Sequence, residues 1–145
     1  MKKFGLIGYP LGHSLSAVIH KAGFKSLGIE ANYEILETPP EELVDRVKYF
    51  KRNDYEGFNV TIPLKLPISL FVQEVDKYAD IAGAVNTVKI NSDKTFKGYN
   101  TDAMGFKKAI PQNLDFSGAN VALLGTGGAS RAAVLALSEL GVKYI

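Results

Sequence analysis

The sequence predicts an α/β protein: a mostly parallel, three-layer domain followed by the beginning of a Rossmann-type unit. Short apolar runs of strand length alternate with segments in which apolar residues recur every three or four positions. A glycine-rich turn separates the last full apolar run from the last helical segment. The length of 145 residues suits one domain plus part of a second.

The composition excludes several classes of protein. The chain is 46% hydrophobic and 22% charged with a net charge of +2, so nothing calls for a nucleic-acid or membrane partner. It has no cysteine, which excludes disulfides and thiolate chemistry, and only two histidines, too few for a histidine-rich metal site. No apolar run approaches the roughly 20 residues that span a bilayer. We expect a cytoplasmic protein without a metal.

The first part of the chain predicts strands and helices in alternation. Apolar residues recur at helical spacing from Leu15 through Val18 and Ile19 to Ala22, which predicts an amphipathic helix that ends near Gly28. Three segments have the composition of strands: residues 4–8, 31–37 and 56–62.

A second helix is predicted to begin after the strand at 31–37. Thr38 stands at the capping position, Pro39 and Pro40 follow, and Glu41 lies three residues after the cap. The helix carries one apolar face: Leu43, Val47 and Phe50.

The remaining elements complete the α/β pattern. Residues 64–81 are expected to be helical, in one or two pieces, and residues 84–90 and 95–100 to form a hairpin around 91–94. A helix over 101–110 stops at Pro111. The second unit is then predicted as a strand at 120–125, a helix at 128–141 and the start of another strand at 142–145. We place one domain at 1–101, and at 102–145 a linker helix with the first βα unit of another.

The glycine turn lies between the predicted strand and helix of the second unit. Its residues are Gly125, Thr126, Gly127, Gly128, Ala129 and Ser130. A helix N-terminus there offers free N–H groups to a pyrophosphate, and glycine lets the phosphates approach the backbone. Glycine turns also join strands to helices for structural reasons alone, but this context favours dinucleotide binding. The residue that selects NAD or NADP is expected about 20 positions further on, so these residues leave that choice open.

Polar side chains follow the first and third predicted strands. Ser14 and Ser16 flank a helix start, where two hydroxyls and the N-terminal N–H groups can hold a carboxylate, although an ordinary N-cap is favoured by these residues alone. Asn59 and Thr61 point to the same face of their strand and Lys65 follows in the next turn. An amide, a hydroxyl and an ammonium at one strand end suit a polyhydroxylated ligand, whereas a solvated lysine is the alternative.

Two further polar residues have both structural and functional interpretations. Asn86 lies in an apolar strand, where it needs hydrogen-bond partners that cross-strand contacts can supply. Asp102 begins a helix, where an acidic residue commonly complements the helix dipole. It also lies at the predicted domain boundary, a common location for active sites.

Taken together and in this order, five segments resemble the shikimate dehydrogenase family: HSLS, GFNVTIPLK, GAVNTV, NTDAMGF and LGTGGASRAA. The resemblance covers essentially the whole chain. It implies that Ser14 and Ser16 hold the substrate carboxylate, and that four residues contact the ring hydroxyls: Asn59, Thr61, Asn86 and Asp102. It also implies a catalytic pair of Lys65 and Asp102, and a nucleotide loop formed by residues 125–129, namely Gly125, Thr126, Gly127, Gly128 and Ala129.

The implied reaction is the reversible reduction of 3-dehydroshikimate to shikimate with NADP as cofactor, in aromatic amino acid biosynthesis. Lys65 would act as general acid or base and Asp102 would orient it. A quinate/shikimate dehydrogenase is the alternative within this class, and a non-catalytic ligand-binding fragment is the alternative outside it. The implied partner is a small molecule, and a homodimer stays open.

The second unit is expected to be a truncated form of the family's nucleotide domain. With one βα unit, four apolar side chains of its helix are expected to lack cover: Val134, Leu135, Leu137 and Leu140. The site residues of the first domain, which come from separate strand ends, are expected to converge on one cleft.

Overall fold

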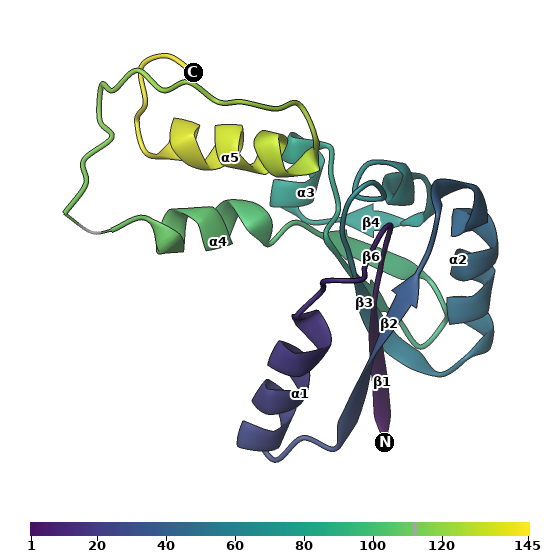
Figure 1. Ribbon diagram of the computed structural model, residues 1–145. Coiled ribbons are helices and arrows are strands. Elements are labelled where there is room, and N and C mark those ends of the chain that lie inside the picture. Colours follow the sequence, from purple (N-terminus) through teal and green to yellow (C-terminus); the bar gives the residue numbers. More distant parts are fainter. Residues whose placement is uncertain (112) are drawn as a thin grey trace.

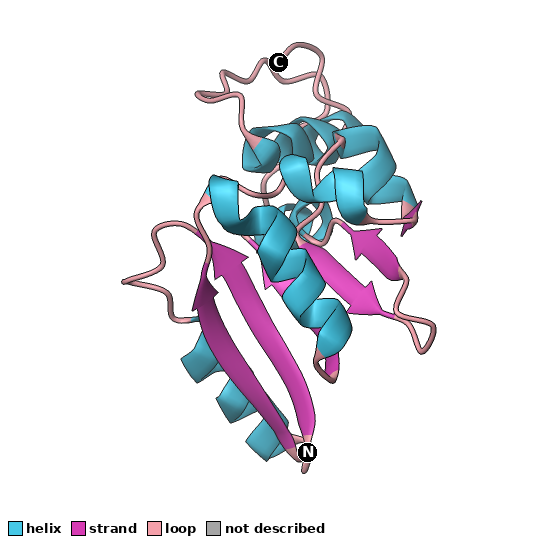
Figure 2. Ribbon diagram, turned by 90° about the vertical axis from the view of Figure 1, so that its right-hand side faces the viewer, coloured by secondary structure: helices cyan, strands magenta, loops and turns pink. Residues whose placement is uncertain are grey.

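A computed structural model describes residues 1–111 and 113–145, and its centre is one six-stranded sheet (Figures 1 and 2). The strand order is β2-β1-β3-β5-β6-β4. β1 pairs in parallel with β2 and β3, β5 is antiparallel to β3 and β6, and β4 is parallel to β6. The bounds are β1 Lys2–Gly8, β2 Ala31–Glu37, β3 Tyr55–Val60, β4 Glu74–Val75, β5 Thr87–Ile90 and β6 Phe96–Tyr99. The predicted mixed but mostly parallel α/β sheet is confirmed.

Helices cover both faces of this sheet, as the three-layer prediction requires (Figure 1). The α-helices are α1 Ser16–Ser26, α2 Leu43–Arg52, α3 Lys77–Ala82, α4 Asp102–Ala109 and α5 Gly128–Glu139. Two short 3₁₀ helices, η1 Pro40–Glu42 and η2 Pro67–Phe71, precede α2 and β4. In the described part of the chain, no helix is both long and apolar enough to cross a membrane.

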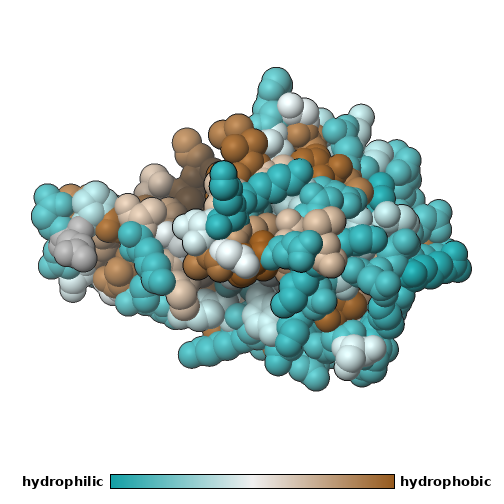
Figure 3. Space-filling view, turned by 90° about the horizontal axis from the view of Figure 1, so that it is seen from below, coloured by the Kyte–Doolittle hydropathy of each residue, from teal (hydrophilic) through white to brown (hydrophobic). Residues whose placement is uncertain are grey.

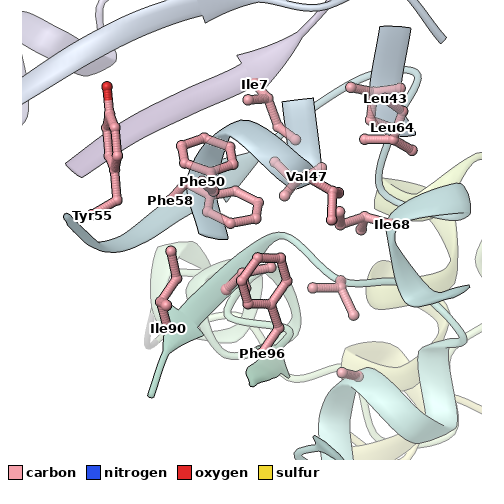
Figure 4. Close-up of a cluster of buried hydrophobic side chains, with 14 residues drawn as sticks. Ile7, Leu43, Val47, Phe50, Tyr55, Phe58, Leu64, Ile68, Ile90 and Phe96 are labelled. Carbon is pink, nitrogen blue, oxygen red and sulfur yellow. The ribbon is translucent and has the colours of Figure 1, made fainter. Parts of the chain in front are cut away.

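The main core lies between the sheet and α2 (Figure 4). Phe50 of α2 stacks on Phe58 of β3 with ring centroids 4.0 Å apart, and Phe96 of β6 meets Phe58 edge-on. On the other face of the sheet, a smaller group that we name the α1-side cluster consists of Leu6, Leu11 and Tyr33, with Phe4, Ala17 and Phe24 packed against it. The sheet is therefore anchored on both sides, and its strand ends are fixed in place.

The helix predicted after the first strand is present, but its apolar stripe faces solvent. Leu15, Val18 and Ile19 are 68%, 67% and 65% exposed. On the opposite side, His20 stacks on a tyrosine ring of the α1-side cluster at 4.2 Å. Figure 3, seen from the side on which α1 lies in Figure 1, shows apolar side chains on this surface among hydrophilic ones. Helical periodicity identifies the apolar side of a helix, but it does not tell which side meets the sheet.

Thr38 does not cap a helix, so that prediction is wrong. Its hydroxyl donates to the Leu36 carbonyl at 2.7 Å and accepts from Nε of Arg46 at 3.0 Å, and the residue is fully buried. The chain instead enters α2 through η1, without a side-chain cap. The predicted apolar face of α2 is confirmed, with three buried side chains: Leu43, Val47 and Phe50.

The segment predicted as helical over 64–81 is more varied. It contains η2, the two-residue strand β4 and the short helix α3, whose N-cap Asp76 accepts from the Ala79 N–H at 2.8 Å. Gln73 joins the start of β4 to β6, because its backbone N–H donates to the Phe96 carbonyl and its side-chain oxygen accepts from the Phe96 N–H. The third strand ends at Val60, two residues before the prediction. The predicted hairpin is confirmed, but its first strand begins at Thr87 instead of at residue 84. The helix before Pro111 is confirmed.

α4 and α5 lie side by side beyond the sheet (Figure 1). Their contact buries Ala103 against Ala132, Leu135 and Ala136, and Lys107 pairs with Glu139 at 2.7 Å. The expectation that α5 lacks cover is therefore only partly right. Leu135 and Leu137 are buried, whereas Val134 is 41% exposed and Leu140 is partly exposed.

The strand predicted at 120–125 does not form. Asn120 makes one isolated parallel bridge with Tyr144, and the Val121 N–H donates to the Tyr144 carbonyl at 2.9 Å. Within the described residues the bridge extends no further, and Leu124 is 97% exposed. The strand predicted at 142–145 is likewise limited to this bridge. An apolar run becomes a strand only where a neighbour pairs with its backbone groups along its length.

Candidate functional site

Lys65 lies just beyond β3, where its backbone is fixed by buried neighbours. Leu64 is fully buried and its N–H donates to the Thr61 carbonyl, while the Val85 N–H donates to the Lys65 carbonyl, both at 2.8 Å. The ammonium of Lys65 lies 2.6 Å from Oδ2 of Asp102, and the two side chains are 17% and 30% exposed. Such a partly buried charge-assisted hydrogen bond is stronger than an exposed ion pair.

Asp102 is held by its backbone and by both carboxylate oxygens. Its N–H donates to Oδ1 of Asn100 at 3.0 Å, and Asn100, 2% exposed, donates to the Ala84 carbonyl at 2.9 Å. Oδ1 of Asp102 accepts from Nδ2 of Asn86 at 2.7 Å, while Oδ2 accepts from Lys65. The carboxylate also stands at the first residue of α4, where the helix dipole favours negative charge.

Asn86 is buried and uses its whole hydrogen-bonding capacity within the protein. Its Nδ2 donates to Asp102 and to the Thr101 hydroxyl, and its Oδ1 accepts from the Thr101 N–H and the Thr87 hydroxyl. An asparagine amide has two N–H donors and two oxygen lone pairs. Direct contact between Asn86 and a ligand therefore requires one of these partners to be replaced.

The hydrogen bonds continue across the sheet to β2. Thr87 accepts from Nδ2 of Asn59 at 3.0 Å, and Oδ1 of Asn59 accepts from the Tyr33 hydroxyl at 2.7 Å. Burial raises the pKa of the Tyr33 phenol, so it remains a donor at neutral pH. Burial also lowers the pKa of His20, which stacks on Tyr33. A continuous series of side-chain hydrogen bonds thus connects Tyr33 to the charged pair.

Ser14 and Ser16 lie beside Thr61 in a hollow of about 400 Å³ next to the start of α1. The N-cap of α1 is Leu15 and no side chain caps it, so the capping interpretation of the two serines is wrong. Ser14 Oγ accepts from the Ser16 N–H at 3.3 Å. The two hydroxyls and the first turn of α1 border this hollow with groups that can donate to an anion.

The glycine turn lies directly beside Lys65. A second hollow, of about 320 Å³, is lined by residues 127–129 on one side and by Thr61 and Lys65 on the other. A Cβ on Gly128 would lie 3.0 Å from Cβ of Lys65, so glycine permits this close approach. Gly125 has a φ of 126°, which L side chains rarely adopt. No side chain caps α5 at Gly127, which leaves the first-turn N–H groups available to a phosphate.

The residues predicted for the site do not all line one hollow, and Asn86 and Asp102 are joined to Lys65 by hydrogen bonds without lining any of the hollows described. Thr61 lines both the hollow beside Ser14 and Ser16 and the hollow beside the glycine turn. Asp102 accepts hydrogen bonds from both Lys65 and Asn86. Asn59 lines a third hollow of about 310 Å³ on the α1 face of the sheet. In the described residues, no three His, Cys, Asp or Glu side chains are grouped as metal ligands.

Three residues of this arrangement were not predicted from the sequence as part of it: Tyr33, Thr87 and Thr101. Each has a side-chain hydroxyl that forms a hydrogen bond with an asparagine of the site. The sequence position of two of them was a signal for the site, since Thr87 follows Asn86 and Thr101 precedes Asp102. Tyr33 gave none, because a tyrosine in an alternating strand fits a core equally well.

Comparison with known proteins shows to which family this chain belongs. The profile of the shikimate dehydrogenase substrate binding domain matches residues 6–88. This chain belongs to the shikimate dehydrogenase family. The match covers the serines, Lys65 and Asn86, and it confirms the resemblance carried by the sequence motifs.

Relatives and solved structures agree with this assignment. A Halothermothrix orenii protein named shikimate dehydrogenase (NADP(+)) is 41% identical over 143 residues, which cover 97% of this chain and 49% of that protein. A Peptoclostridium difficile shikimate dehydrogenase structure matches with a TM-score of 0.94 at 36% identity, over 99% of this chain and 53% of that one. A Thermus thermophilus shikimate 5-dehydrogenase, in complex with NADP(H) and shikimate, matches with a TM-score of 0.88 at 39% identity, covering 99% and 54% of the two chains. This chain spans about half the length of the curated relatives it matches.

Proposed function

We propose that this chain supplies the substrate site and the catalytic pair of an NADP-dependent shikimate dehydrogenase, which reduces 3-dehydroshikimate reversibly to shikimate. The observation that carries the proposal is the Lys65–Asp102 ion pair, 2.6 Å long, beside the glycine turn at the start of α5. Family membership supplies the reaction class, since relatives over this region bear that name.

The substrate is a ring with one carboxylate and several hydroxyls, and the site offers a group for each. Ser14 and Ser16, at the first turn of α1, would hold the carboxylate. Asn59 and Thr61, at the carboxyl end of β3, would bind ring hydroxyls. Asn86 would reach a ring hydroxyl only by exchanging one of its present partners for it, because its amide is already fully bonded.

Lys65 would transfer the proton of the reaction. Its ammonium has three N–H donors, and one of them is directed at Asp102. The described residues provide no second acceptor for it, so the other two can reach a substrate oxygen. Lys65 would give its proton to the ketone oxygen as the alcohol forms and recover it in the reverse direction. Asp102 holds the ammonium in place and would accept from the neighbouring ring hydroxyl.

The residues around the glycine turn fit a dinucleotide cofactor. Gly128 allows the turn to approach Lys65, Gly125 has a backbone conformation that suits glycine, and the first turn of α5 is uncapped. Gly125, Thr126, Gly127, Gly128 and Ala129 would hold its pyrophosphate. NADPH, when bound, would supply the hydride for the reduction, and NADP⁺ would accept it in the reverse direction.

Binding to the 145-residue chain tests the proposal. We expect calorimetric titration with shikimate to give saturable binding, weakened about tenfold or more by Ser16→Ala. Ser92→Ala, in the turn between β5 and β6, is the matched control and should bind as the wild type does. Absence of shikimate binding would overturn the proposal, and tighter binding of quinate than of shikimate would favour a quinate/shikimate dehydrogenase.

A titration with NADPH tests the cofactor site separately. In the described part of the chain, the segment before the glycine turn makes a single β-bridge, at Asn120, and does not form a strand. We therefore expect binding weaker than micromolar, together with little oxidation of shikimate by NADP in the isolated chain. Micromolar binding, or ready turnover followed by NADPH absorbance, would show that one helix N-terminus and its turn suffice.

A further inference from the structure

We propose that Thr87, together with Tyr33, is a positioning residue that fixes the side-chain amide of Asn59 in one orientation for the substrate. This inference rests on the proposed function for the identity of the ligand. It rests on the observed hydrogen bonds for the orientation itself. Neither residue contacts the charged pair, and both would act through Asn59.

The orientation is first set at Asn86. Its Oδ1 accepts from the Thr101 backbone N–H at 3.0 Å, a group that can only donate. Its Nδ2 donates to the Asp102 carboxylate at 2.7 Å, a group that can only accept when ionised. The reverse amide orientation would place two donors together on one side and two acceptors together on the other, so Asn86 has one stable orientation.

Thr87 transmits this orientation to the next strand position. The atom of Asn86 that faces the Thr87 hydroxyl is Oδ1, at 3.0 Å, so Thr87 must donate its single proton there. Its oxygen can then only accept from Asn59, which lies opposite Thr87 in the β3–β5 pairing. Nδ2 of Asn59 occupies that position at 3.0 Å.

Tyr33 completes the arrangement at the other side of the amide. Its hydroxyl lies 2.7 Å from Oδ1 of Asn59 and donates to it. Tyr33 is 2% exposed, and its phenol is kept in the protonated, donating form because burial raises its pKa. Asn59 therefore retains one N–H and one lone pair for a ligand, at fixed positions. A substrate hydroxyl meets one pattern of donor and acceptor instead of a mixture of two.

The test compares Thr87→Val, which removes the hydroxyl and keeps the shape, with Thr87→Ser, which keeps the hydroxyl. In the 145-residue chain we expect Thr87→Val to weaken shikimate binding about five- to tenfold, and Thr87→Ser to stay within about twofold of the wild type. Thr95→Val, in the turn between β5 and β6, is the control outside the network and should not change binding. Tyr33→Phe should weaken binding in the same direction as Thr87→Val.

A second measurement does not depend on the ligand. We expect the side-chain amide protons of Asn59, followed by ¹⁵N NMR, to exchange with water roughly tenfold faster in Thr87→Val and at the wild-type rate in Thr87→Ser. Equal exchange rates in the two variants would overturn the proposal. So would equal shikimate affinities, provided that the wild type binds. If the wild type binds no shikimate, the proposed function fails, and the exchange rates alone decide the role of Thr87.

Discussion

The two sides of the proposed site are supported in different ways. The Lys65 side stands on a sheet in which every strand has a paired neighbour, and its polar side chains are linked by hydrogen bonds from Tyr33 to Asp102. The glycine turn stands on α5, which is held through its packing on α4 and α3, and the segment before it makes one β-bridge. One side is fixed by paired strands and a hydrogen-bond network, and the other mainly by the packing of α5 on two helices.

This difference shows what a binding geometry requires from the fold. Positions of donors and acceptors in the substrate site must be accurate to fractions of an ångström, which paired strands and a buried core provide. A phosphate-binding turn needs only free N–H groups and space, which a helix N-terminus provides by itself. We therefore expect substitutions beneath the substrate site to cost more than substitutions beside the glycine turn.

The largest effect is expected in the main core. Phe50 is fully buried and stacks on Phe58, so Phe50→Ala should lower the free energy of unfolding by about 3–5 kcal/mol, measured by urea denaturation. Leu124→Ala, before the glycine turn, should change it by less than about 0.5 kcal/mol, because Leu124 is 97% exposed. A cost for Leu124→Ala close to that for Phe50→Ala would mean that this segment is packed in solution, and the contrast would be lost.

A smaller effect is expected from breaking the charged pair. Asp102→Ala removes the acceptor of both Lys65 and Asn86, and we expect a loss of about 1–3 kcal/mol in stability. The same substitution should weaken shikimate binding about tenfold or more. Asp45→Ala, which breaks the exposed pair with Lys48, is the control and should leave stability and binding nearly unchanged. Equal effects of the two variants would count against a special role for Asp102.

Gly128→Ala probes the contact between the two sides. The added Cβ would lie 3.0 Å from Cβ of Lys65, so either the lysine or the start of α5 must move. Because α5 is held mainly by α3 and α4 and not by strand pairing, we expect a cost at the low end of the roughly 1–3 kcal/mol typical of overpacking. Gly127→Ala is the matched control, since nothing lies within 4 Å of its added Cβ. A Gly128→Ala cost above this range would show that α5 is as firmly held as the core.

The sequence was sufficient for the elements that local patterning defines. The alternating strands, the buried face of α2 and the 84–100 hairpin follow from periodicity and turn residues, and the motif residues led to the Lys65–Asp102 pair. Pairing partners could not be predicted in this way. The run at 120–125 had the composition of a strand, but in the described residues it pairs with a neighbouring segment only at the bridge between Asn120 and Tyr144. β4 was missed because a strand of two residues carries no periodic pattern. The hydrogen bond between Asn59 and Tyr33 likewise joins residues 26 positions apart in sequence.

The smallest effect concerns His20, which supports the substrate side from α1 by stacking on Tyr33 at 4.2 Å. Burial lowers the pKa of His20 below its ordinary value of 6.5, so the folded chain binds this proton less readily than the unfolded chain does. The stabilising contribution of the neutral ring is therefore complete above pH 6.5 and is lost as the pH falls from 6.5 through the lower folded-state pKa. We expect urea denaturation between about pH 8 and pH 5 to show a modest acid loss of stability that is reduced in His20→Phe, which keeps an aromatic ring but does not titrate. An identical pH dependence in the two proteins would show that the imidazole is equally easy to protonate in both states, and that the stack on Tyr33 does not favour its neutral form.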